Sequence, residues 1–96
     1  MNDSYKKFQF AQYSILLHDV RWRNKCKEIL KRDEKKCIIC KSKEHLHVHH
    51  RQYHFSKAMK RHINPWEYNN FYLITLCENC HKVGHTQYKV PVKEIK

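Results

Sequence analysis

Two Cys-x-x-Cys pairs, Cys37-Ile-Ile-Cys40 and Cys77-Glu-Asn-Cys80, constrain this chain more than any other feature of its sequence. Two residues between cysteines allow a tight turn to direct both sulfurs at one ion, and four thiolates complete a tetrahedral zinc site with no open position. The sequence therefore predicts a structural Zn²⁺ site. Because 36 residues separate the pairs, more than a minimal zinc ribbon needs, a substructure must be inserted between the halves of the site.

Metal rather than disulfide chemistry is expected of these cysteines. A chain of 96 residues suits one domain, whose small core often needs a staple or a metal. Five cysteines are an odd number for a disulfide framework, and the start, MNDSYKKFQF, lacks the apolar run of a signal peptide. No stretch approaches the roughly 18 apolar residues of a membrane span. We therefore expect a cytoplasmic protein without a membrane partner, in a compartment where paired cysteines bind metal.

The charge of the chain favours a polyanionic partner. Lys and Arg outnumber Asp and Glu by 20 to 9, for a net charge of +11, and nucleic acid is a better guess than an anionic membrane. Ten basic residues against three acidic ones fall between positions 21 and 43. This segment predicts an amphipathic helix over 19–33, capped by Asp19, with Trp22, Cys26, Ile29 and Leu30 on one apolar stripe. Cys26 is then a core residue, and the opposite face is cationic. The candidate DNA-binding residues are Arg21, Arg23, Lys25, Lys27, Lys31 and Arg51.

The insertion between the cysteine pairs predicts a hairpin. Leu46 and Val48 alternate with His45, His47 and His49 in one short strand, and Leu73, Ile74 and Leu76 form a second that runs into Cys77. The connection over 51–72 is long for a hairpin and contains Pro65-Trp66-Glu67-Tyr68, whose aromatics can pack across the loop.

A second metal site is expected where the hairpin meets the segment after Cys80. On a helix His81 and His85 lie one above the other, so both imidazoles can bind one ion. If the hairpin folds back, His49 completes this site and His50 is left to act as a general base. Strict alternation would put His49 and His50 on opposite faces, so the strand must twist or bulge there. The remaining histidines of this region, His45, His47, His54 and His62, are expected at the surface or in contact with phosphates.

Several segments together resemble the small bacterial and phage HNH endonucleases, whose core is the ββα-metal finger: LHVHHRQY, PWEY, LITLCENCHKVGH, the first cysteine pair and the helix DVRWRNKCKEILKRD. The resemblance covers roughly residues 13–85. It implies that His49, His81 and His85 bind the catalytic metal and that His50 is the general base. The family's asparagine, which orients the base, corresponds to Tyr72 here; Asn69 or Asn70 could replace it from the loop, or a backbone carbonyl could, and we assign Asn70 to the site.

The resulting hypothesis is a small α+β protein, a ββα-metal (HNH) finger stapled by the four-cysteine zinc site and preceded by a basic amphipathic helix. The chain is expected to divide into an arm over 1–17, a nuclease domain over 18–88 and a tail over 89–96. The tail is expected to be an edge strand or frayed. The expected activity is hydrolysis of phosphodiester bonds in double-stranded DNA, with Mg²⁺, Mn²⁺, Ni²⁺ or Zn²⁺ as the catalytic ion. A zinc-stabilised module that only binds nucleic acid is the alternative. Cys77-x-x-Cys80-His81 also fits a haem attachment pattern, but the second cysteine pair and the basic surface argue against haem.

Overall fold

Two short sheets and two helices make up the fold of this chain, seen in a computed structural model that describes residues 13–87 and 90–96, without the side chains of 85–87. The elements in chain order are α2 (Val20–Arg32), β1 (Leu46–His50), β2 (Tyr53–Ser56), β3 (Arg61–His62), the 3₁₀ turns η1 (Pro65–Glu67) and η2 (Asn70–Tyr72), β4 (Leu73–Cys77), α3 (Glu78–Gln87) and β5 (Val92–Ile95).

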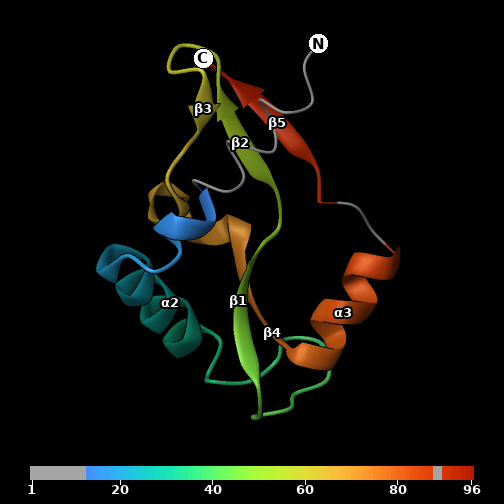
Figure 1. Cartoon of the computed structure of the whole chain (residues 1–96). Coiled ribbons are helices and arrows are strands. Elements are labelled where there is room, and N and C mark those ends of the chain that lie inside the picture. The colour runs from blue at the N-terminus through green and yellow to red at the C-terminus, as the bar shows by residue number, and fades with distance from the viewer. Residues whose placement is uncertain (1–12, 88–89) are drawn as a thin grey trace.

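The antiparallel pair β1–β4 lies between the two helices, with α2 on one side and α3 on the other (Figure 1). Its register runs without interruption from Leu46 opposite Cys77 to His50 opposite Leu73. The predicted hairpin is therefore present, and the expected small α+β class is confirmed. The bulge expected at the end of the first strand is absent from this register. Neighbouring side chains of β1 consequently point to opposite faces, one toward α2 and one toward α3.

Helix α2 begins where the sequence predicts. The Asp19 carboxylate accepts a hydrogen bond from the backbone N–H of Arg21 (2.8 Å), which caps the helix. The apolar stripe buries Trp22 and Ile29 against Tyr68 and Leu73, with Cys26 at the edge of the cluster. The interpretation of Cys26 as a core residue agrees with this packing, and burial raises the pKa of its thiol to about 11.

The end of α2 is a Schellman motif built without glycine. The N–H of Lys35 bonds the carbonyl of Leu30 (2.8 Å), and the N–H of Glu34 bonds that of Lys31 (3.1 Å). Both Glu34 and Lys35 have positive φ, 58° and 54°. Side chains with a Cβ disfavour this conformation, so the turn holds backbone strain that a glycine would remove.

Two neighbouring charged residues fasten α2 to the β1–β4 pair. The guanidinium of Arg32 donates to the carbonyls of Asn70 and Leu73, both at 2.6 Å, and also bonds the carboxylate of Asp33. The same carboxylate accepts the backbone N–H of Thr75 (3.0 Å). Because these bonds satisfy backbone groups of η2 and β4, they fix the orientation of the basic helix relative to the strands.

The long connection after β1 contributes β2 and β3 to a second sheet, whose strand order is β3-β2-β5 (Figure 1). Strand β2 pairs with β3 antiparallel and with β5 parallel. The predicted packing of aromatics in this segment is present: Tyr68 is buried and its hydroxyl accepts the backbone N–H of His54 (2.8 Å). The segment expected as a tail contributes β5, which lies at the edge of this sheet.

The predicted N-terminal arm lies mostly outside the described residues. Residues 1–12 are not described, residues 13–16 are helical, and Tyr13 is buried. Among the helices that the structure describes, none has the length and apolar character needed to cross a membrane.

Candidate metal centre and histidine face

The four cysteines of the two pairs come together, as predicted. Their sulfur atoms all lie within 4.8 Å of one another. The first pair sits in a tight turn, where Lys41 N–H bonds the carbonyl of Cys37 (3.0 Å) and Cys37 N–H bonds that of Ser42 (2.8 Å). In the second pair, Cys77 ends β4 and Cys80 lies in the first turn of α3. The cluster therefore ties the loop before β1 to the junction of β4 and α3.

The donor set fits a structural metal such as zinc. In a tetrahedral site with Zn–S bonds of about 2.3 Å, neighbouring sulfurs are about 3.8 Å apart. The sulfurs of Cys40 and Cys77 are separated by 3.5 Å, close to that value. Burial raises the pKa of Cys37, but backbone N–H groups of Cys40, Cys77 and Ile39 outweigh it and lower that pKa to about 6. The Cys37 sulfur is thus favoured as a thiolate, the form that binds metal, whereas the hydrogen bond with Cys77 raises the pKa of Cys80 to about 12. Four sulfurs leave no open position for substrate.

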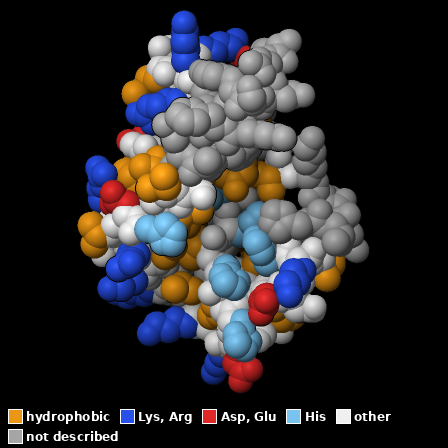
Figure 2. Space-filling model, in the orientation of Figure 1, with side chains coloured by type: hydrophobic (Ala, Val, Ile, Leu, Met, Phe, Trp, Pro, Cys, Tyr) orange, Lys and Arg blue, Asp and Glu red, His pale blue; other side chains and the backbone are white. Residues whose placement is uncertain are grey.

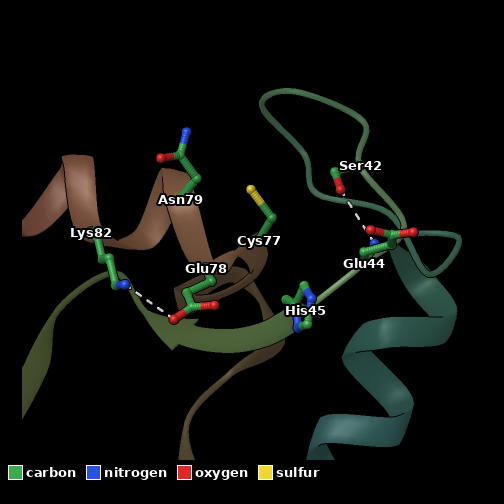
Figure 3. Close-up of a pocket in the computed structure, with 7 residues that line it drawn as sticks. All are labelled: Ser42, Glu44, His45, Cys77, Glu78, Asn79 and Lys82. Atoms are coloured by element: carbon green, nitrogen blue, oxygen red, sulfur yellow. Dashed lines mark hydrogen bonds and ion pairs between the residues drawn. The ribbon is translucent and has the colours of Figure 1, made fainter.

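A pocket of about 260 Å³ lies beside the cysteine cluster (Figure 3). It is lined by Ser42, Glu44, His45, Cys77, Glu78, Asn79 and Lys82. Lys82 pairs with Glu78 across one turn of α3 (3.1 Å), and the Ser42 hydroxyl accepts the backbone N–H of Glu44 (3.3 Å). The polar groups of this pocket thus bond within its own walls, and the predicted catalytic histidines do not line it.

Histidines from β1 and α3 share one face of the β1–β4 pair. The ring centroids of His49 and His81 are 5.0 Å apart, and those of His47 and His81 are 6.0 Å apart. Figure 2 shows histidine side chains gathered on this side of the molecule, with Lys, Arg and acidic groups around them. The hydrogen bond from Lys82 lowers the pKa of Glu78, and His45 and His47 add to this effect.

Of the expected catalytic metal ligands, His49 and His81 are therefore close neighbours. His85 lies in α3 one turn after His81, but its side chain is outside the described residues. His47 was expected at the surface or in contact with phosphates, not beside His81. The sequence did indicate that His47 shares a face with His49, because His47 comes two residues before His49 and residues i and i+2 of a strand share a face.

His50 faces the other way, into the aromatic core beside α2. Its ring stacks on Trp22 (4.9 Å between centroids, 13° between planes) and meets Tyr68 edge-on at 4.7 Å. Only 4% of the residue is exposed. Nε2 lies 3.3 Å from both the Tyr13 hydroxyl and the carbonyl of Pro65. Because a carbonyl only accepts, the contact with Pro65 requires a hydrogen on Nε2.

Burial lowers the pKa of His50 to about 4, against a small opposing effect of the Pro65 carbonyl. The ring is therefore neutral at pH 7, as a general base must be. In this conformation, however, it lies on the face of β1 opposite His49. The expectation that a twist or bulge would bring the two histidines to one site is not met by the strand register.

The contacts of the Asn70 side chain do not match the role of orienting the base that was assigned to it. The side-chain nitrogen of Asn70 donates to the carboxylate of Glu28 in α2 (3.1 Å), and the side-chain oxygen Oδ1 of Asn70 is buried. The group that contacts the ring of His50 in place of an asparagine is the Pro65 backbone carbonyl. A backbone carbonyl was the other possibility that the sequence left open.

The candidate DNA-binding residues are distributed along α2 and at the end of β1. Arg23, Lys27 and Lys31 are exposed. Arg21 bonds the Asp19 carboxylate and lies 4.1 Å over the ring of Trp66, so it also has a structural role. Lys25 is half-buried near Glu28, and the exposed Arg51 lies over Phe71.

Comparisons of the chain with models of protein families, with curated proteins and with solved structures find no match, so the resemblance to HNH endonucleases rests on the residues quoted for it.

Proposed function

We propose that this chain is a zinc-stabilised endonuclease of the HNH type that binds double-stranded DNA and hydrolyses its phosphodiester bonds. The observation that carries the proposal is the 5.0 Å separation of the His49 and His81 rings on the α3 side of the β1–β4 pair. Two imidazoles bound to one ion through M–N bonds of about 2.1 Å have centroids about 4.5–5.3 Å apart. The two rings therefore lie at a separation suited to a shared cation.

The residues of this face would divide the work between holding the ion and positioning DNA. His49 and His81 would hold a divalent cation, with His85 joining them from the next turn of α3. The bound ion would polarise a phosphoryl oxygen of the DNA. Exposed cations of α2 would bind the flanking phosphates and orient the backbone without reading its sequence.

A module that binds nucleic acid without cutting it is the second candidate, and the position of His50 favours it. The base implied by the resemblance is 4% exposed, stacked on Trp22 and directed away from His49. A base must reach the proton that it abstracts, either directly or through one water. Catalysis by His50 would therefore require this ring to leave the aromatic core.

A nicking assay on supercoiled plasmid separates the two candidates. Purified zinc-loaded protein is tested with added Mg²⁺, Mn²⁺ or Ni²⁺, alongside His81→Ala and the matched control His18→Ala, which removes an exposed histidine outside this face. The endonuclease proposal expects cleavage by wild type and the control and its loss in His81→Ala, with the gel shift of a DNA duplex unchanged.

Two outcomes contradict the endonuclease proposal. A gel shift without cleavage under every metal assigns the chain to the binding module. Cleavage that survives in both His81→Ala and His49→Ala excludes the histidine face as its site. A further variant, His50→Gln, tests the base: cleavage at the wild-type rate would mean that His50 does not take the proton.

A further inference from the structure

A single exposed aromatic ring lies beside the basic helix. The exposed large hydrophobic side chains of the described residues are aliphatic or methionine except one, Phe71 of η2, which is 66% exposed. The guanidinium of Arg51 lies over this ring at 5.2 Å from its centroid, and Tyr72 meets it edge-on at 5.3 Å. About two thirds of Phe71 is thus exposed to solvent next to a positive charge.

The backbone around Phe71 is held in place by several hydrogen bonds. Its N–H bonds the side-chain oxygen of Asn69 (2.9 Å), and the N–H of Arg51 bonds the carbonyl of Tyr72 (2.7 Å). Arg32 of α2 donates to the carbonyl of Asn70 at 2.6 Å. The exposure of Phe71 is therefore set by a braced turn, and the ring sits where the last turn of the cationic helix meets η2.

We propose that Phe71, together with Arg51, is a stacking platform for an unpaired nucleobase of a bound nucleic acid strand. Every base has an aromatic face, so a flat ring binds bases without regard to sequence, and a neighbouring arginine adds a cation–π contribution. Lys31, an exposed cation in the last turn of α2, would attract the phosphates of the same strand. This inference rests on the proposed binding of nucleic acid and extends it to single-stranded segments.

The test measures affinity by fluorescence anisotropy for three labelled probes at one fixed ionic strength. The probes are a short single strand, the same sequence as a duplex, and the single strand with its central nucleotides abasic. The proteins are full-length, zinc-loaded wild type, Phe71→Ala, Phe71→Leu and Phe71→Tyr. Because Phe71 is exposed, the variants are expected to fold, which zinc content and circular dichroism verify.

Stacking predicts that Phe71→Ala and Phe71→Leu bind the single strand about tenfold more weakly than wild type, while Phe71→Tyr retains the affinity. All four proteins should bind the duplex equally. On the abasic strand the difference between wild type and Phe71→Ala should vanish, because the phosphates remain and the bases are gone.

The failures of this inference and of the proposed function are distinguishable. If wild type binds the duplex or the single strand but Phe71→Ala binds the single strand equally well, the stacking platform is refuted and nucleic-acid binding stands. If Phe71→Leu retains full affinity, apolar contact rather than stacking is responsible, and the platform is again refuted. If wild type binds no probe, both proposals fall.

Discussion

Acidification should destabilise this protein through the buried His50. The pKa of this imidazole is lowered from its ordinary 6.5 to about 4 in the fold, because burial penalises the charged ring. Above pH 6.5 the ring is neutral in both the folded and the unfolded chain, and its contribution to stability does not vary with pH. As the pH falls below 6.5, the imidazole of His50 binds a proton in the unfolded chain but not in the folded chain.

The expected loss follows from linkage. Between pH 6.5 and 4 the free energy of unfolding should fall by about 2.6 kcal/mol, out of about 3.4 kcal/mol over the full titration, with a slope that approaches about 1.4 kcal/mol per pH unit midway. Below pH 4 the folded protein also binds the proton, and this contribution levels off. For a domain of this size, whose stability is on the order of 5–15 kcal/mol, the loss is large.

Urea unfolding of zinc-loaded wild type and His50→Gln, at half-unit steps from pH 7.5 to 4, checks this value. Glutamine does not titrate, and its amide can donate to the Pro65 carbonyl in place of Nε2. Protonation of the cysteine thiolates also weakens the protein in acid, but it acts on both proteins and cancels in the difference. Equal dependence of stability on pH in the two proteins would refute the burial argument, and with it the assignment of His50 to the core.

Three further predictions concern the zinc site and α2. Cys37→Ser should lose its bound zinc and most of its circular dichroism signal at 25 °C, whereas Cys26→Ser should keep the metal, as metal content measured by atomic absorption will show. Glu34→Gly should raise the free energy of unfolding by about 0.5–1 kcal/mol by relieving the positive φ, while Lys36→Gly should not raise it; equal effects would mean that strain is absent. Arg32→Lys should cost about 1.5 kcal/mol in urea unfolding, because an ammonium has three donors and lacks the planar fork through which Arg32 makes four bonds; an unchanged midpoint would contradict the bracing role.

Local patterns in the sequence predicted the parts of the fold that depend on few residues close together. Cysteine spacing predicted the metal cluster, a 3.6-residue period predicted α2, alternation predicted β1, and the apolar residues before Cys77 predicted β4. The spacing of His81 and His85, with the hairpin folded back, also predicted that His49 could meet His81.

The remaining features depend on contacts between distant segments. The parallel pairing of β2 with β5 joins residues 53–56 to 92–95, and a pattern within either segment says nothing about its partner. Alternation placed His50 on the face opposite His49, and a twist or bulge was expected to bring the two histidines together, but the register of β1 is uninterrupted there. Trp22 and Tyr68 provide an aromatic environment on the far face of β1, which makes burial of a neutral imidazole acceptable there. The turn after α2 carries Glu34 where a glycine would have marked the end of the helix.

The late position of β5 in the chain has a consequence for synthesis on the ribosome. Every cysteine of the cluster, helices α2 and α3 and the β1–β4 pair precede β5 in the chain, so the metal-bound half can form without β5, and one edge of β2 stays open until β5 docks. An open strand edge of this kind invites pairing with other nascent chains.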